Sequence, residues 1–420
     1  MNKWLAVTLC YVMISAPLLA DPPKWLLGTA VKLPSETTNQ ESGYFSIIEG
    51  KNQKLYIGSA KYGVNGFLLE YDPKSNRTRV VMDVMQTIGS TATGFAAQAK
   101  IHTRNNVGES GVIYVGSKQG YPEKGESKDA YLGGYVLTHD PATGKNLHYG
   151  IPKPKHGVIS VMPDESRGVV YLSTCSDDRP IDHTHFMMLN LKTKQVRDFG
   201  DMEQAYAFIV LDHQGRAYHP IRGGTIARYD PNTDQLERLT VTLDGKPLPD
   251  SWTKDHAILN WDTTRDRKTL YSVEMVTNEL VKFDLTQSGK VLNGTRVGPI
   301  LSQAKRIDCR CMCVGPTGTV WMAVTEQGLP RGPQLHLVSY RPGDSAPIHH
   351  GPVGVKNPDF TTFVNADGSA KPWHHTMRKE PDGILTPWQP LGICEGSDGV
   401  VNIITIAPFT LMRIEGVRRP

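Results

Sequence analysis

The sequence contains none of the short motifs that mark several large enzyme classes. A GxSxG elbow, a Walker A loop, a GxGxxG turn after a strand, an HExxH helix and a CxxCH haem site are all missing from the 420 residues. Such motifs fix a nucleophile, phosphate groups, a zinc ion or haem in a defined local geometry. Nucleophilic serine, phosphoryl-transfer and haem chemistry therefore have no support in the sequence.

The chain also has little excess of charge of either sign. Lys and Arg total 46 and Asp and Glu total 42, which leaves a formal net charge of +4. No run of basic residues is present, and scattered charge is typical of a solvated surface rather than of a nucleic-acid interface. With 39% apolar and 21% charged residues, the composition is that of a soluble globular protein. We expect a monomer that binds no nucleic acid.

The apolar stretch at the N-terminus, Trp4 to Ile14, is too short to span a membrane. It follows the basic Lys3 and precedes a segment of small and apolar residues ending at Ala20, which is the order of regions in a secretory signal peptide. Cys10 lies inside this stretch without a small residue before it, which argues against a lipoprotein anchor. We therefore expect residues 1–20 to be a signal peptide, no membrane span, and a secreted or periplasmic protein.

Cysteine is rare, and five cysteines follow the predicted signal peptide: Cys175, Cys309, Cys311, Cys313 and Cys394. An odd number leaves at least one thiol outside any disulfide. The three in the 309–313 segment alternate along a predicted strand, so we expect them to point to one face. Neighbours two apart on a strand lie ~6.6 Å apart with parallel side chains, which disfavours a disulfide between them.

What the sequence does contain is a repeat. An apolar run, a turn with Gly or Asp, and a strand centred on an aromatic residue recur seven times, the last degenerate. Successive anchors are spaced from 47 residues (Tyr171 to Tyr218) to 81 residues (Trp321 to Asn402). Periods of ~40–50 residues built from short strands are typical of β-propeller blades. The anchors are Tyr56, Tyr114, Tyr171, Tyr218, Tyr271, Trp321 and Asn402.

The repeat predicts an all-β fold: one seven-bladed β-propeller domain over residues 21–420, closed by N- and C-terminal strands. Residues 409–414 read as the third strand of the last blade, and residues 26–33 supply its outer strand. Such closure removes two exposed sheet edges. The segment 342–390 shows no clear strand pattern, so we expect a long insertion there, and loops of that length are usually functional or disordered.

Titratable residues stand where the inner strands begin. His156, Tyr206 and His256 occupy this position in three consecutive blades, which packing alone does not explain, although water-linked channel groups are the alternative. His102 and Arg104 lie on the inner strand of blade two. Arg222 ends the hairpin that begins at Tyr206, and a guanidinium beside an acid/base group suits a carboxylate substrate.

A metal site is the second prediction. Cys309 and Cys311, with Cys313 beside them, and His374 or His375 offer Cys/His ligands for a divalent metal, zinc or calcium. Buried inert thiols on a core strand are the alternative.

At the level of the repeat, the chain resembles secreted seven-bladed propeller enzymes that act on carbohydrates. These are the ulvan and oligogalacturonate lyases, and the rhamnose–glucuronate lyases and rhamnosidases. Three motifs carry the resemblance: Ala99-Lys100-Ile101-His102-Thr103, Gly133-Gly134-Tyr135 before His139-Asp140-Pro141, and Tyr206 with Arg222.

The resemblance implies β-elimination beside a uronic acid. Arg222 would neutralise the carboxylate, His102 would take the C5 proton and Tyr206 would protonate the leaving oxygen. Some relatives hold a Cys/His zinc, which Cys309, Cys311 and His374 would echo. We expect the substrate-binding residues to be Arg104, Gln119, His219 and Trp373.

One departure keeps alternatives open. The lyases often carry a second histidine after the second strand of blade two, where this chain reads Ser117-Lys118-Gln119-Gly120. His156 or His256 would replace it in a lyase acting on a uronate-containing saccharide. Otherwise the protein is a rhamnosidase-like hydrolase, or a propeller that binds saccharide or protein without catalysis.

Overall fold

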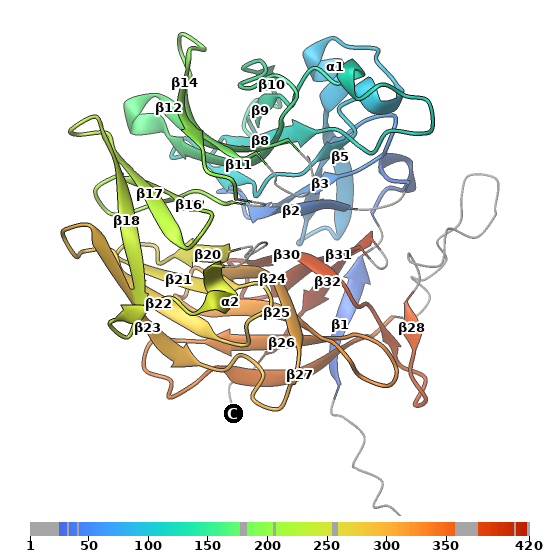
Figure 1. Cartoon of the computed structure of the whole chain (residues 1–420). Coiled ribbons are helices and arrows are strands. Elements are labelled where there is room, and N and C mark those ends of the chain that lie inside the picture. The colour runs from blue at the N-terminus through green and yellow to red at the C-terminus, as the bar shows by residue number, and fades with distance from the viewer. Residues whose placement is uncertain are drawn as a thin grey trace, which may run out of the picture.

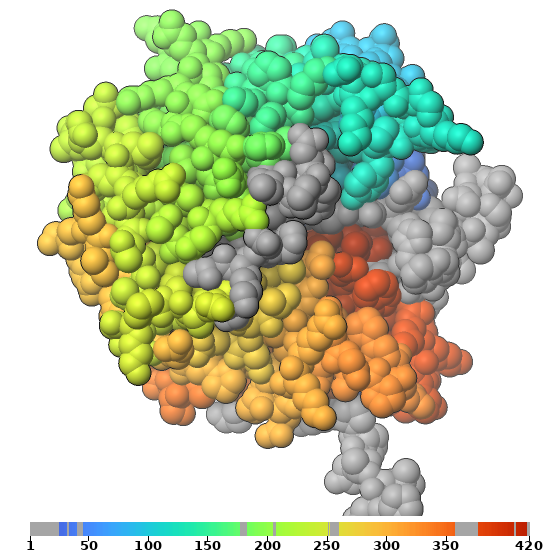
Figure 2. Space-filling model, viewed as in Figure 1, coloured from blue at the N-terminus to red at the C-terminus, as the bar shows by residue number. Residues whose placement is uncertain are grey.

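Short antiparallel sheets follow one another around a ring in the computed structural model of the chain (Figure 1). The structure describes residues 25–31, 33–39, 42–176, 183–204, 207–253, 259–357, 377–406 and 409–417. The predicted signal peptide lies outside these ranges. The described strands form seven blades in chain order, and the colours of the space-filling view follow the same order around the ring (Figure 2). The all-β propeller predicted from the repeat is confirmed.

The first three blades are separate sheets. Blade one contains β2 (Ser42–Glu49), β3 (Leu55–Ser59), β4 (Phe67–Asp72) and β5 (Arg77–Asp83). Blade two contains β6 (Lys100–Ile101) and β7 (Asn106–Val107), which share the inner position, then β8 (Ile113–Lys118), β9 (Val136–His139) and β10 (Asn146–His148). Blade three contains β11 (Gly157–Asp164), β12 (Val169–Cys175), β13 (His185–Asn190) and β14 (Val196–Asp201).

The other four blades are joined in pairs. Blade four contains β15 (Val210–Leu211), β16 (Ala217–Ile221), β17 (Thr225–Asp230) and β18 (Gln235–Leu243). Blade five contains β20 (Leu259–Thr263), β21 (Thr269–Glu274), β22 (Leu280–Asp284) and β23 (Val291–Gly298). Blade six contains β24 (Ile307–Val314), β25 (Val320–Glu326), β26 (Gln334–Tyr340) and β27 (Ile348–Val355). Blade seven contains β30 (Pro390–Glu395), β31 (Val401–Ile406), β32 (Phe409–Ile414) and β1 (Leu26–Val31).

Short elements lie in the connections between these strands. They are the helices α1 (Val84–Ile88) and α2 (Asp250–Thr253), the strands β19 (Lys246–Pro247), β28 (Arg378–Lys379) and β29 (Leu385–Thr386), and 3-10 turns at Ser35–Thr37, Gly94–Ala96, Lys128–Ala130 and Glu165–Arg167. In the part of the chain that the structure describes, no helix is long and apolar enough to cross a membrane.

The aromatic anchors of the repeat lie on the second strand of each blade and are buried between blades. Tyr56, for example, packs with Leu68 of its own blade and with Ile113 and Leu137 of blade two. Burial of such large rings dominates core stability. The hydroxyl of Tyr56 is satisfied by Glu70 at 3.0 Å. The repeated residue is therefore the one that joins neighbouring blades.

The Asp turns of the repeat also have a local cause. In the turn that ends the third strand of four blades, an Asp carboxylate accepts a hydrogen bond from the backbone N–H two residues later, at 2.8–2.9 Å: Asp72, Asp140, Asp230 and Asp284. An Asp side chain that bonds its own backbone in this way fixes a tight turn.

The termini close the ring as predicted. β1 pairs antiparallel with β32, from Thr29–Arg413 to Val31–Leu411, and so becomes the outer strand of blade seven. The first half of β1 pairs in parallel with β27 of blade six, at Leu26–Val353. One N-terminal strand therefore covers the edges of two blades.

The segment 342–390 is not free of strands, which corrects the expectation from the sequence. Residues 348–355 form β27, the outer strand of blade six, although their sequence IHHGPVGV contains little of the usual strand pattern. The strand is irregular: its register against β26 shifts between Leu337 and Val338. An outer strand tolerates such bulges because only one of its edges faces its own sheet.

Candidate functional site

The inner strands all begin on one face of the ring, called here the start face, and end on the opposite end face. On the start face, between blades two and three, lies a cavity of about 440 Å³ that we call the blade-two pocket. Its lining residues are Phe95, Lys100, Lys118, Gln119, Gly120, Tyr121, Pro122, Lys128, Asp129, Tyr131, Lys155, His156 and Ser176. Four of these are lysines and one is an aspartate, so the lining has a positive charge.

Two of the lysines are buried side by side. Lys100 on β6 and Lys118 on β8 are paired directly across the two strands, and they are 2% and 1% exposed. Like charges placed opposite each other destabilise a sheet, and lysine is almost never fully buried. The pair therefore places two ammonium groups side by side in the wall of the pocket.

The surroundings of the two ammonium groups are aromatic and polar. Lys100 Nζ lies 3.3 Å from the hydroxyl of Tyr62, and it lies 4.9 Å and 5.0 Å from the ring centres of Tyr62 and Tyr121. Lys118 Nζ lies 3.4 Å from the sulfur of Cys175. The aromatic faces attract the cation and hold the Lys100 side chain in place.

The pocket wall is set by a local network. Ser117 donates to Gln98 Oε1 at 2.7 Å, and Gln98 Nε2 donates to the carbonyl of Gly133 at 2.9 Å. Gly134 must be glycine, since a Cβ there would lie 2.1 Å from the carbonyl oxygen of Ser117. The Gly133-Gly134 loop is therefore held against β8, beside the two lysines.

His102 is near this pocket but does not line it. The side chain is 1% exposed and packs edge-on against Phe45, with ring centres 5.8 Å apart. Burial, together with the charges of Lys118 and Lys100, holds the pKa of His102 well below its usual value. His102, the base that the resemblance implies, is therefore neutral at pH 7 and buried outside the lining of this pocket.

His156 does line the pocket. Its Nδ1 lies 3.2 Å from Thr174 Oγ1, and its ring packs edge-on against that of His185, with 5.3 Å between centres. His185 in turn bonds Asp198 at 2.8 Å. Burial, then the charges of His185 and Lys153, lowers the pKa of His156 to about 4. His156 is therefore neutral at pH 7 and able to accept a proton.

Gln119, which the sequence predicts as a substrate-binding residue, lines the same pocket and is 3% exposed. Tyr121 stands at the rim, 60% exposed, with its ring edge-on to Tyr62 at 5.3 Å. Exposed aromatic rings beside a polar pocket suit the apolar face of a sugar ring. The pocket thus combines positive charge, an amide, a neutral histidine and an aromatic rim.

Several predicted residues are elsewhere or are not described. Tyr206, His256, Trp373, His374 and His375 lie outside the described residues, so the structure does not place them. Arg222 follows β16, where its backbone N–H donates to Met202, and it does not line the blade-two pocket. His219 is 0% exposed: its Nε2 lies 2.9 Å from Ser173 Oγ and its ring stacks on Phe186, which makes it a packing residue between blades three and four.

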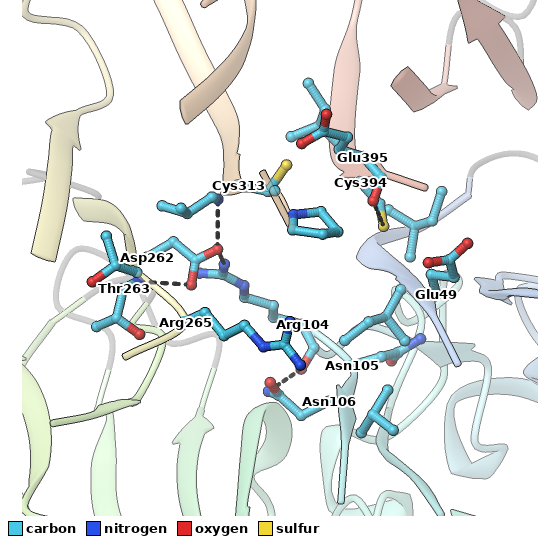
Figure 3. A pocket seen from close by; sticks show the side chains of 18 of the residues that line it. Glu49, Arg104, Asn105, Asn106, Asp262, Thr263, Arg265, Cys313, Cys394 and Glu395 are labelled. Atoms are coloured by element: carbon cyan, nitrogen blue, oxygen red, sulfur yellow. Dashed lines mark hydrogen bonds and ion pairs between the residues drawn. The ribbon is translucent and has the colours of Figure 1, made fainter. Parts of the chain in front are cut away.

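Arg104 belongs to the end face. Its guanidinium crosses the channel from blade two to blade five, where it bonds Asp262 at 2.7 Å and the carbonyl of Trp261 (Figure 3). It also lies over the ring of Phe208. Although only one residue separates it from His102, Arg104 is not part of the blade-two pocket. Sequence proximity on an inner strand does not place two side chains in one site.

The three cysteines of β24 do not share a face, which corrects the prediction. The register of β24 against β25 shifts between Asp308 and Cys311. A bulge of this kind reverses the alternation of side chains. Cys309 therefore packs between blades five and six, whereas Cys311 and Cys313 pack between blades six and seven.

These thiols have the properties of core residues. Burial raises the pKa of Cys309, Cys311 and Cys313, which disfavours the thiolate that a metal needs. Among the described residues, no group of three His, Cys, Asp or Glu side chains is placed to hold a metal ion. The predicted combination of Cys309 and Cys311 on one ion is not supported by this geometry.

Sequence reasoning missed Lys100 and Lys118 as functional candidates. Lys100 lies inside the motif around His102, and Lys118 lies where the resemblance implies a second histidine. The signal that identifies them is a lysine inside an otherwise apolar strand, repeated on the neighbouring strand. Only the pairing of β6 with β8 shows that the two side chains are opposite each other.

Comparison with known proteins supports the fold and goes no further. No protein-family model matches the sequence, and no curated protein matches it. Among solved structures, U3-55K aligns with a TM-score of 0.56 and 8% identity over 94% of this chain and 99% of that one. The β-propeller domain of Cps50 (Swd1) from Myceliophteria thermophila aligns with a TM-score of 0.54 and 9% identity over 93% and 100%.

A third structure comes from B. thetaiotaomicron. It is the extracellular domain of a hybrid two component system protein, with a TM-score of 0.52 and 11% identity over 93% of this chain. The present chain spans 40% of the length of that domain. Identities this low establish that these proteins share the propeller fold with this chain, and a shared propeller fold does not imply a shared function.

Proposed function

We propose that the protein is exported and binds an acidic saccharide in the blade-two pocket, where it cleaves the saccharide next to a uronic acid by β-elimination. The observation that carries the proposal is the buried pair of Lys100 and Lys118 at the wall of a pocket that His156 also lines. The N-terminal sequence supports export.

The two ammonium groups would neutralise the uronate carboxylate. In β-elimination the C5–H bond becomes acidic only when the neighbouring carboxylate is neutralised, because negative charge moves onto it as the proton leaves. Positive groups already held in a site of low dielectric stabilise that charge without reorganisation. Lys100 and Lys118 would thus take the role that the resemblance implies for Arg222.

His156 would remove the C5 proton. It is neutral at pH 7, and binding of a carboxylate beside it raises its pKa towards the value a base needs. The C5–H and C4–O bonds break, a C4–C5 double bond forms, and the protonated His156 returns the proton to the leaving oxygen. Tyr121, which packs edge-on against Tyr62, would support the sugar ring at the rim.

A second candidate function is binding of an acidic saccharide without cleavage. The observation that favours it is the same low pKa of His156, because a histidine with a pKa of about 4 is a weak base unless substrate raises it. The anion site would then act as a recognition element alone.

The test uses the purified protein and a panel of uronate-containing polysaccharides. Ultraviolet absorbance detects the unsaturated product of elimination, chromatography detects free rhamnose from hydrolysis, and titration calorimetry detects binding. We expect absorbance to rise, and to be lost in Lys118→Met and in His156→Gln. Lys192→Met and His213→Gln, at exposed positions on blades three and four, are the controls and should retain activity.

The variants separate the two functions. Binding that is lost in Lys118→Met but unchanged in His156→Gln, without any product, would establish the binding function. Release of rhamnose without ultraviolet absorbance would replace the lyase by a hydrolase. Activity that survives in both Lys100→Met and Lys118→Met would contradict the assignment of the site.

A further inference from the structure

The end face contains a second cavity, of about 590 Å³, at the mouth of the channel (Figure 3). Residues from the inner-strand ends of all seven blades line it. Arg104 lines this cavity and also a small cavity of about 30 Å³ deeper in the channel, so its bridge to Asp262 stands between the two. We call the outer cavity the end-face pocket. It is separate from the blade-two pocket, with which it shares no lining residue.

The charges of the end-face pocket balance and are separated in space. Its lining holds three arginines and three carboxylates. Arg104 and Asp262 neutralise each other across the channel. The remaining carboxylates come from blades one and seven, and the remaining guanidinium groups come from blade five, on the other side of the mouth: Glu49, Glu395, Arg265 and Arg267.

The acidic side is fixed in place by hydrogen bonds but has no cation. Glu49 accepts from Ser397, from its backbone N–H at 2.9 Å and its hydroxyl at 3.0 Å. Glu395 is 5% exposed and accepts from Thr317 Oγ1 at 3.2 Å. Within the described ranges neither carboxylate forms an ion pair. A buried carboxylate without a cation is costly, and an ammonium group that enters the pocket relieves that cost.

The basic side is also without counter-charge. Arg265 and Arg267 lie on the turn between β20 and β21, and neither side chain has an acidic partner among the described residues. Figure 3 shows Arg265 extending from the blade-five side into the cavity. A guanidinium presents a planar fork that matches a carboxylate. One side of the pocket therefore suits an ammonium group and the other suits a carboxylate.

We propose that the end-face pocket binds a zwitterionic small molecule of the amino acid or short peptide class. Its ammonium group lies at Glu49 and Glu395, and its carboxylate lies at Arg265. The balanced charge of the lining disfavours a polyanion such as an acidic saccharide, so this ligand differs in class from that of the blade-two pocket. The inference does not rest on the function proposed for the start face.

The test is calorimetric titration of the whole protein with glycine, glycylglycine and triglycine. N-acetylglycylglycine and glycylglycine amide, each lacking one charge, are the matched ligands. We expect one of the three zwitterions to bind, with both blocked peptides at least ~10-fold weaker, since a hydrogen-bonded charge contributes about 1.5 kcal/mol or more. The length that binds best reports the span between the two sides.

Variants test each side of the pocket separately. Glu49→Gln should abolish the difference in affinity between glycylglycine and its N-acetyl form. Arg265→Gln should abolish the difference in affinity between glycylglycine and glycylglycine amide. Glu123→Gln and Arg238→Gln, at positions outside the pocket, are the controls. Lys118→Met should leave peptide binding unchanged, which keeps this result distinct from that on the start face. Equal binding of the blocked and free peptides, or no binding of any of them, would overturn the proposal.

Discussion

Replacing Arg104 by methionine tests the bridge across the channel. The guanidinium makes an ion pair of 2.7 Å with Asp262, and the two side chains are 19% and 23% exposed. Removing one partner of a fully buried pair costs about 3–5 kcal/mol, whereas an exposed pair contributes about 0–1 kcal/mol. The partial exposure places this pair between those limits, at about 2 kcal/mol. The bond to the buried carbonyl of Trp261 adds about 1 kcal/mol.

We therefore expect Arg104→Met to lower the free energy of unfolding by about 3 kcal/mol. Urea denaturation measures the change as a lower midpoint with an unchanged slope. Arg197→Met is the control, because Arg197 and its partner Asp234 are 45% and 66% exposed and should contribute less than about 1 kcal/mol. In the double variant with Asp262→Asn, much of the loss should return, because no carboxylate is left without its cation.

Two results would refute this reasoning. Equal losses of unfolding free energy in Arg104→Met and Arg197→Met would mean that the ion pair across the channel contributes no more to stability than an ordinary surface pair. A double variant as unstable as the sum of the two single variants would mean that Arg104 and Asp262 do not interact energetically.

Three further predictions follow from buried groups and edges. Burial raises the pKa of Glu274 from 4.5 to about 7, so the folded state binds a proton more tightly than the unfolded state. The free energy of unfolding should therefore rise as pH falls from 7 to 4.5. Glu274→Gln should remove this pH dependence and raise the free energy of unfolding by about 3 kcal/mol at pH 8, as measured by urea titration. Cys394, the only described thiol that is partly exposed, should react first with a small thiol reagent under native conditions, slowly because its pKa is raised to about 12, while Cys309 stays unmodified until the protein unfolds. Deletion of residues 1–31 removes β1 and leaves the edges of β27 and β32 open, so light scattering should show aggregation that the chain lacking only residues 1–20 does not show.

Much of the fold was predictable because a propeller repeats its pattern. The aromatic anchor fills the same space between blades each time, so Tyr56 or Tyr171 identifies its strand without reference to the others. β27 escaped detection because an irregular outer strand does not need the alternating pattern that the inner strands require. The bulge in β24 escaped detection for a related reason: nothing in the side chains of 309–313 reports an inserted residue.

The site was predictable only in part. His156 and Gln119, both named from the sequence, line the blade-two pocket because a residue at the start of an inner strand or at the end of the second strand opens onto the start face. His102 and Arg104 both lie between β6 and β7, but His102 packs against Phe45 and Arg104 crosses to blade five. The face of the ring towards which a channel side chain points depends on the packing of the whole ring, and the local sequence does not determine it.

The pairing of outer strands divides the ring unequally. β18 and β23 join blades four and five along Thr240–Leu243, and β1 joins blades six and seven, so each pair of blades forms one continuous sheet. Among the described strands, no such seam joins blades one, two and three, which remain separate sheets. The blade-two pocket lies at the junction of two of these separate sheets. Backbone hydrogen bonds from Gly134 to His156 and from Lys155 to Leu132 join the two sheets at the pocket. A ligand bound there therefore contacts a junction made by loops rather than by paired strands.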